Sequence, residues 1–384
     1  MMDDGAFDPM SGDDEPPSIA DPGHPLRDDP PRRVVVFRAL KLGDMLCATP
    51  ALRALRGGLP DAEIILVGLP WAREFVDRQS GLLDGFREFP GWPGLPERAP
   101  DLDAIPTFFD KIRAEQFDLA IQLHGSGAVS NGVVSLFGAR RLAGFCASGG
   151  ARRDSRFFLP YPGRGLEIRR LLSLVEHLGF PSRGEALEFP LEENDRRAAR
   201  RLLAARGVDP DAFACVHAGA SVAERRWPVE RFAAAADVLV DRGLAVVLTG
   251  SASEAGLALA IRRRMRNPAV NLAGATPLGT LGAVLERAAL LLCNDTGVSH
   301  IAAALKTPSV VISTGDNPAR WAPPDGRRHR VLCRASGVPV AEAVAVIIGL
   351  LNDPICLSRS RRPAREDVHA AAHANPHFER TPTS

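Results

Sequence analysis

Short apolar runs alternate with amphipathic segments along most of the chain. Residues 34–37 (Val-Val-Val-Phe) and 63–68 (EIILVG) have the composition of buried parallel strands. Between these runs, residues 45–56 have the apolar spacing of a helix, which Gly57 and Gly58 are expected to end. A strand, a helix and a strand in this order predict a right-handed βαβ unit.

The same alternation continues almost to the end of the chain. Further strands are predicted at 117–123, 212–217, 245–249, 270–272, 289–293 and 309–313, and further helices at 169–178, 195–206, 229–242, 253–266, 278–288, 298–305 and 340–351. Residues 179–193, rich in Pro, Gly and Glu, separate two such series and mark the expected domain boundary. The pattern therefore predicts an α/β fold of two Rossmann-like domains with parallel sheets, whose ligands bind in a cleft at the carboxyl ends of the strands.

The two ends of the chain depart from this pattern. Residues 1–31 are rich in Asp, Pro and Gly with almost no apolar periodicity, and we expect a disordered acidic arm. Residues 357–384 are polar, and we expect a disordered tail. The predicted domains are therefore residues 32–185 and 186–356.

Composition narrows the class of protein. The formal net charge of +1 gives no indication of a polyanionic partner, so we expect no nucleic acid. No apolar run reaches the roughly 18 residues that span a bilayer, and the acidic N-terminus is unlike a secretory signal. Six cysteines without a CxxC pair predict free, mostly buried thiols in a reducing compartment, and hence a cytoplasmic protein. They are Cys47, Cys146, Cys215, Cys293, Cys333 and Cys356.

The strongest local motif is residues 294–300 (NDTGVSH), which lie between a predicted strand and a predicted helix. A helix that begins at the end of a strand offers free N–H groups and a positive dipole, which suit an anion. Thr296 can cap this helix, and Gly297 lets a phosphate approach the backbone. The alternative is a capped turn without a ligand, and His300 by itself is more often a core histidine.

A second motif joins residues 217–221 (HAGAS) to Arg225-Arg226-Trp227-Pro228. Small residues, the Ser221 hydroxyl and two guanidinium groups are what a pyrophosphate requires, since Arg binds phosphate oxygens bidentately. The alternative is a solvated loop that carries a surface arginine pair.

A third motif is residues 38–44 (RALKLGD), at the end of the first strand. The dipole of the following helix should hold Asp44 ionised, which suits a general base. The alternative is an aspartate that only caps the helix.

In a fourth motif, residues 249–254 (TGSASE), Glu254 could accept hydrogen bonds from a ribose diol. The alternative is a capping box formed by Ser251 and Glu254. The dinucleotide-binding and P-loop motifs are missing, and so is any HExxH or Cys/His set, which predicts that no metal is bound.

Taken together, these segments resemble glycosyltransferase family 9, the heptosyltransferases. Residues 37–44 with 48–55 resemble the N-terminal signature of the family. Residues 217–221 with 226–228 resemble its donor-phosphate segment, and residues 271–276 with 294–305 resemble its nucleotide-sugar segment. The order and spacing agree over roughly Arg33 to Leu351.

The resemblance implies a GT-B fold, with the acceptor on the N-terminal domain and the nucleotide sugar on the C-terminal domain. It implies inverting, metal-independent transfer with Asp44 as the general base. The residues implied to bind the donor are Ser221, Arg225, Arg226, Glu254, Asp295, Thr296, Gly297 and His300, and those implied on the acceptor side are Arg38, Lys41 and Gly43.

The expected reaction moves a sugar, expected to be heptose from ADP-heptose, to a lipopolysaccharide-core or other surface-glycan acceptor without a cofactor. A lipid-linked acceptor would bring this protein, expected to be a monomer, into peripheral contact with the inner membrane. Two alternatives remain open at this point: a catalytically inactive nucleotide-sugar-binding protein, and a sugar-nucleotide epimerase on the same fold.

Overall fold

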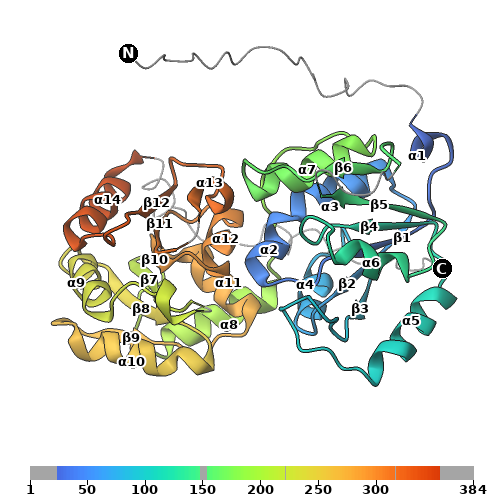
Figure 1. The fold of residues 1–384 in the computed structure, drawn as a ribbon. Coiled ribbons are helices and arrows are strands. Elements are labelled where there is room, and N and C mark those ends of the chain that lie inside the picture. Colours follow the sequence, from blue (N-terminus) through green and yellow to red (C-terminus); the bar gives the residue numbers. More distant parts are fainter. Residues whose placement is uncertain (1–23, 148–153, 221, 316, 355–384) are drawn as a thin grey trace, which may run out of the picture. The chain divides into compact units, whose positions relative to one another are not determined.

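The computed structural model describes residues 24–147, 154–220, 222–315 and 317–354, which divide into two compact units (Figure 1). Unit 1 contains the described chain up to Leu191 together with segments 296–305 and 317–324. Unit 2 contains segments 192–295 and 306–315 and the described chain from Asp325 onward. The domain limits 32–185 and 186–356 stay a prediction of the sequence.

Unit 1 is built on a six-stranded parallel sheet in the order β3-β2-β1-β4-β5-β6. Its strands are β1 (Arg33–Phe37), β2 (Glu63–Gly68), β3 (Gly85–Glu88), β4 (Leu119–Gln122), β5 (Arg141–Cys146) and β6 (Phe158–Pro160). Its helices are α1 (Pro25–Asp28), α2 (Leu42–Cys47), α3 (Thr49–Gly58), α4 (Ala72–Arg78), α5 (Ala104–Ala114), α6 (Ser130–Ser135), α7 (Glu167–His177), α12 (Gly297–Ala304) and α13 (Pro318–Trp321).

Unit 2 repeats the plan with a parallel sheet in the order β12-β11-β10-β7-β8-β9. Its strands are β7 (Phe213–His217), β8 (Ala245–Thr249), β9 (Ala269–Asn271), β10 (Leu291–Asn294), β11 (Ser309–Ser313) and β12 (His329–Cys333). Its helices are α8 (Glu193–Ala204), η1 (Ala223–Arg225), α9 (Val229–Val240), η2 (Ala252–Glu254), α10 (Ala255–Arg264), α11 (Leu278–Arg287) and α14 (Val340–Asn352).

The central strands are apolar throughout because helices cover both faces of each sheet. In β1, Val35 and Phe37 pack with Phe109 and Ile112 of α5 on one face. The alternate residues, such as Val36, point to the opposite face and are also fully buried. The expectation of an α/β fold with parallel sheets in both halves is therefore confirmed.

The helix predicted over residues 45–56 is two helices, α2 and α3, which meet at Ala48. Pro50 lies in the first turn of α3, where its missing N–H costs no hydrogen bond, but it could not continue α2. The Thr49 hydroxyl donates to the Leu46 carbonyl at 2.8 Å, which satisfies one of the last carbonyls of α2. The break sets α2 apart as a short helix directly after β1.

The disorder predicted for residues 1–31 is wrong for residues 24–31, because α1 is held by unit 1. Leu26 is fully buried, the amide of Leu26 donates to His24 Nδ1 at 3.2 Å, and Arg141 donates to the Asp29 carbonyl at 3.0 Å. One buried leucine in a polar segment gives no periodic signal, so the sequence pattern could not reveal this anchor. Residues 1–23 and the predicted tail 357–384 lie outside the described residues.

As expected, the cysteines in the described part of the chain are not joined in disulfides. Cys47, Cys215 and Cys293 are buried, Cys146 is half-buried and Cys333 is exposed, while Cys356 lies outside the described residues. Among the described helices, none is both long and apolar enough to cross a membrane.

Candidate active site

Each sheet has a point where the direction of chain progression reverses, and ligands of open α/β sheets bind at the carboxyl ends of the strands there. In unit 1 the chain runs from β1 outward to β2 and β3, and then returns to β4 on the other side of β1. The reversal therefore lies between β1 and β4, where Arg38 and Leu123 follow their strands. In unit 2 it lies between β7 and β10, where Ala218 and Asp295 follow theirs. Three of the four predicted motifs thus begin at the two positions that the topology favours, whereas the motif at 249–254 follows β8.

Asp44 is the third residue of α2, half-buried beyond the carboxyl end of β1. The backbone amide of Lys41, at the N-cap, hydrogen-bonds its carboxylate. Burial nevertheless raises the pKa of Asp44 above its usual value, against the opposing charge of Arg38. Desolvation therefore outweighs the effect predicted for the helix dipole on this pKa, and the carboxylate becomes a stronger base. That Asp44 is ionised at neutral pH stays a prediction.

Arg38 is buried, with 1% of its surface exposed, and its guanidinium faces the protein interior. Its Nε and Nη2 donate to the Asp44 carbonyl at 3.0 and 2.9 Å, and Nη1 donates to the Leu123 carbonyl. Nη2 also lies 3.4 Å from Glu167 Oε1. The predicted contact between Arg38 and the acceptor is therefore revised, because this buried guanidinium fixes the backbone at Asp44. Of the two cations predicted on the acceptor side, Lys41 is the one whose side chain is exposed.

Gly43 lies where α2 crosses α12. A Cβ on Gly43 would be 2.9 Å from His300 Cδ2, and a Cβ on Gly297 would be 3.2 Å from the Gly43 nitrogen. Any larger residue would push the two helices apart, so the glycines serve the helix crossing. The crossing brings residue 297 beside the helix turn that carries Asp44.

His300 is 3% exposed and lies within this helix crossing. Its Nδ1 is 3.7 Å from the Cys47 sulfur, and burial lowers the pKa of His300 to about 4, so the ring is neutral at neutral pH. The structure gives His300 the role of a core histidine, and it does not bring the ring to a donor surface. Its position on the inner face of α12 causes this.

Thr296 occupies the N-cap of α12, but its side chain accepts no capping hydrogen bond, contrary to the prediction. Its carbonyl instead receives the Ser299 hydroxyl at 2.7 Å and the Ser299 amide at 2.9 Å. The neighbouring Asp295 is half-buried, and Ser313 Oγ donates to its Oδ2 at 3.4 Å. The first amides of α12 are therefore not capped by the Thr296 hydroxyl.

Asn294, whose role the sequence did not reveal, joins two loops of unit 2. Its side chain is fully buried at the end of β10. Nδ2 donates to the Ala218 carbonyl at 2.7 Å, and Oδ1 accepts from the Trp227 amide at 2.9 Å. The indole of Trp227, 1% exposed, donates in turn to the Val338 carbonyl at 2.8 Å. One amide thus fixes the loop after β7 relative to the segment that carries the arginine pair.

Arg226 is held over the loop after β7. Its Nε and Nη2 donate to the Ala220 carbonyl at 3.3 and 3.0 Å, and the side chain is half-buried. Arg225 belongs to the short helix η1 and is exposed. Ser221, predicted to contact the same phosphate, lies outside the described residues. The structure thus places one guanidinium at the loop that the sequence assigned to a pyrophosphate.

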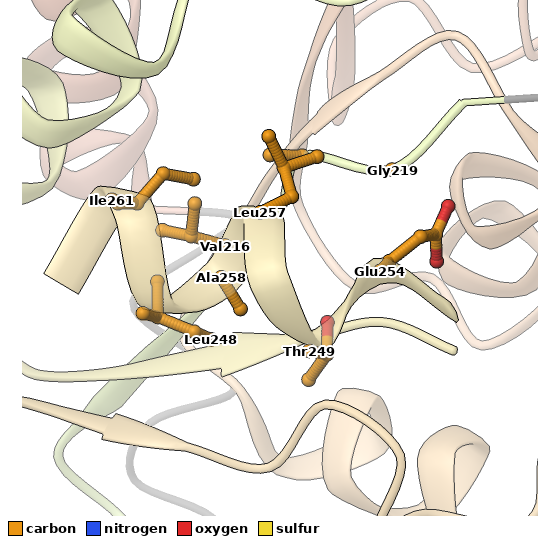
Figure 2. A pocket seen from close by; sticks show the side chains of 9 residues that line it. Val216, Gly219, Leu248, Thr249, Glu254, Leu257, Ala258 and Ile261 are labelled. Carbon is orange, nitrogen blue, oxygen red and sulfur yellow. The ribbon is translucent and has the colours of Figure 1, made fainter. Parts of the chain in front are cut away.

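Glu254 forms the predicted capping box with Ser251, whose amide and hydroxyl both donate to Oε2 at 2.8 Å. The carboxylate also lies against Gly219, where a Cβ would overlap Oε1. Figure 2 shows it among the residues that line a small pocket, together with Thr249 and apolar side chains. The Nε2 atom of His217 lies 4.0 Å from Oε2 of Glu254. Burial lowers the pKa of this histidine. The capping role is confirmed, and it holds the carboxylate beneath the loop after β7.

Sequence reasoning missed an ionic cluster around Glu167, the first residue of α7. Its side chain is 4% exposed and receives Arg170 Nη1 at 2.6 Å and Arg320 Nε at 3.0 Å, in addition to Arg38. Burial acts to raise the pKa of Glu167, but the three arginines hold it below its usual value. No local motif could reveal this cluster, because Glu167 and Arg320 are 153 residues apart in the chain.

Metal binding has no support within the described residues, which contain no group of three or more His, Cys, Asp or Glu side chains suited to an ion. The metal-independence predicted from the sequence stays a prediction.

Solved structures share this arrangement of two parallel sheets. A glycosyl transferase family 9 protein from Veillonella parvula DSM 2008 matches with a TM-score of 0.69 at 21% identity, covering 83% of this chain and 97% of that one. Escherichia coli ADP-heptose lps heptosyltransferase II matches with a TM-score of 0.65 at 19% identity, covering 83% and 98%. The fold is that of the GT-B glycosyltransferases.

Sequence comparison is more specific. The family model described as glycosyltransferase family 9 (heptosyltransferase) matches residues 105–339. The chain is also 28% identical over 292 residues to lipopolysaccharide heptosyltransferase 3 of Escherichia coli (strain K12), covering 73% of this chain and 82% of the relative. The chain belongs to glycosyltransferase family 9 and is a heptosyltransferase of that family.

Proposed function

We propose that this enzyme transfers heptose from ADP-heptose to a lipopolysaccharide-core acceptor, with inversion and without a metal or cofactor, and that Asp44 is the general base. The names of its relatives support the donor and the acceptor. The observation that carries the assignment of the base is the position of Asp44: half-buried, beyond the carboxyl end of β1, with its backbone fixed by Arg38 and its pKa raised. A general base works best when its pKa approaches the working pH.

In the proposed reaction, Asp44 accepts the proton of an acceptor hydroxyl while that oxygen attacks the anomeric carbon of heptose. The bond between this carbon and the diphosphate oxygen breaks, and ADP leaves with the bonding electron pair. Negative charge grows on the diphosphate, so fixed donors there stabilise the transition state. We assign this role to Arg226, to the backbone amides at Thr296 and Gly297, and to Ser221.

The remaining donor contacts follow from the same loops. Oε2 of Glu254 accepts hydrogen bonds from Ser251, so we assign Oε1, which lies against Gly219, to the ribose hydroxyls. Asp295 and Arg225 are assigned to the heptose and the phosphates. Lys41 is assigned to the acceptor, because its side chain is exposed at the start of α2.

A cytoplasmic enzyme that acts on a lipid-linked core would meet its acceptor at the inner face of the membrane. We propose peripheral contact there and a monomeric enzyme.

Asp44→Asn tests the assignment of the base. The substitution keeps the shape of the side chain but removes its basicity, so we expect kcat to fall by about 10²- to 10⁴-fold. ADP binding, measured by calorimetry, should stay within about twofold. Mass spectrometry of the products separates heptosyl transfer from epimerisation or hydrolysis.

Asp103→Asn is the matched control, since Asp103 is an exposed aspartate at the N-cap of α5. It should retain full turnover. Near-normal turnover of Asp44→Asn would show that the base is another group.

A further inference from the structure

Glu167 is the centre of a charge cluster that two helices and a loop build in unit 1. Arg170 follows it on α7, Arg320 reaches it from α13, and Arg38 reaches it from the loop after β1. Arg170 Nε also donates to the Pro162 carbonyl at 2.9 Å, and Arg320 Nη2 donates to the Tyr161 hydroxyl at 3.1 Å. Each guanidinium is therefore held by more than one contact.

The cluster is joined directly to Asp44 through Arg38. The same Nη2 atom that lies 3.4 Å from Glu167 Oε1 donates to the Asp44 carbonyl at 2.9 Å. A movement of the Glu167 carboxylate would therefore release the guanidinium that fixes the backbone at Asp44. Arg320 stands apart from the core, with 36% of its side chain exposed on a four-residue helix. Because Arg320 is not part of the buried core, core packing alone does not account for its ion pair with Glu167.

We propose that Glu167 is a positioning residue for the general base: it fixes the guanidinium groups of Arg38 and Arg320 beside Asp44. This inference rests on the proposed function of Asp44. Glu167 does not touch substrate in this scheme. It acts on the reaction by keeping one negative and two positive charges at constant positions around the carboxylate that takes the proton.

The charges around Asp44 act with opposite signs. Burial and the negative charge of Glu167 raise the pKa of Asp44, whereas the positive charges of Arg38 and Arg320 lower it. Removing Glu167 or Arg320 should therefore move the basicity of Asp44 in opposite directions. A purely structural role for the cluster would not produce such a pair of effects.

Other groups packed against α2 do not account for this behaviour. His300 of α12 is neutral above a pKa of about 4. On α3, Arg53 pairs with Glu188 and Arg56 pairs with Asp84. Near neutral pH, the fixed charges that act on Asp44 are therefore those of the Glu167 cluster.

The test is the pH dependence of kcat/KM for heptosyl transfer from ADP-heptose. In Glu167→Gln the acid limb should move to lower pH, and in Arg320→Gln it should move to higher pH, each by about half to one pH unit. Arg320 is partly exposed, so its variant keeps the test decisive if Glu167→Gln does not fold. A shift to higher pH in Arg320→Gln supports the proposal, and an unchanged limb overturns it.

The control is Glu286→Gln, which removes a carboxylate that binds Arg196 at 2.9 and 3.0 Å in unit 2. Its acid limb should coincide with that of the wild type. Shifts of the same sign in Glu167→Gln and Arg320→Gln would overturn the positioning role. Failure of the base assignment is distinguished by Asp44→Asn: full activity in that variant refutes the general base, whereas an inactive Asp44→Asn with unshifted cluster variants refutes only the role of Glu167.

Discussion

Replacing Asn294 by alanine should loosen the donor loops more than any exposed substitution of the same kind. The amide bonds the Ala218 carbonyl at 2.7 Å and the Trp227 amide at 2.9 Å, and its side chain is fully buried. Alanine leaves both backbone groups without this partner. Because Arg226 directly precedes Trp227, the loss should disturb the guanidinium as well as the fold.

The expected magnitude follows from these two bonds. Leaving a buried donor or acceptor unsatisfied costs about 1–3 kcal/mol. Two such groups, with partial relief from water that enters, give a loss of about 2–5 kcal/mol in the free energy of unfolding. This is a large fraction of the roughly 5–15 kcal/mol by which a typical domain is stable. Displacement of Arg226 should raise the KM for ADP-heptose by about tenfold, equivalent to about 1.4 kcal/mol.

Urea unfolding at constant pH measures the first quantity, and initial rates against ADP-heptose concentration measure the second. Asn194→Ala is the control, because Asn194 is exposed in α8 and its Oδ1 accepts a hydrogen bond from the exposed side chain of Arg197. It should change the stability by less than about 0.5 kcal/mol. A loss below about 1 kcal/mol in Asn294→Ala, with an unchanged KM, would refute the argument that this amide fixes both loops.

Two further predictions concern Gly219 and His300. Gly219→Ala places a methyl group on the Glu254 carboxylate and should raise the KM for ADP-heptose by about tenfold; Gly256→Ala, where a Cβ meets nothing within 4 Å, should leave it unchanged. For His300, the unfolded chain takes up a proton near pH 6.5 and the folded chain only near a pKa of about 4, so stability is complete above pH 6.5 and falls as the pH drops toward 4. Between pH 7 and pH 4.5, the free energy of unfolding measured with urea should fall by about 2–3 kcal/mol more in the wild type than in His300→Gln. An equal fall in both proteins would contradict this prediction.

The fold was predictable where strands are buried on both faces. Residues 63–68, 245–249 and 309–313 are continuous apolar or β-branched runs, and β2, β8 and β11 have these same limits. Sequence reasoning missed β3, β5, β6 and β12: β6 is very short, and each of the other three contains an arginine. β3 carries Arg87 and Glu88 at one edge of its sheet, and the edge strand β6 has only three residues. A pattern based on hydrophobicity cannot detect an edge strand whose side chains are not all buried.

The site was predictable where its residues follow one another in the chain. The Ser251–Glu254 capping box is a local spacing, and Asp44 is marked by its place after a strand. Roles that depend on burial could not be predicted. Arg38 looks like a ligand contact in the sequence, yet its guanidinium is directed inward by contacts with Leu123 and Glu167, which are 85 and 129 residues away.

The arrangement around Glu167 also constrains how such a chain can change over evolution. Arg38 and Arg170 are almost fully buried, and each depends on the same carboxylate for charge balance. Loss of that carboxylate alone would leave several cations in a poorly solvated interior, a change that costs more than replacing the whole set by apolar residues. Positions 38, 167, 170 and 320 are therefore expected to be inherited together or exchanged together, so that in a large collection of related chains they vary as one group even though they belong to three separate segments.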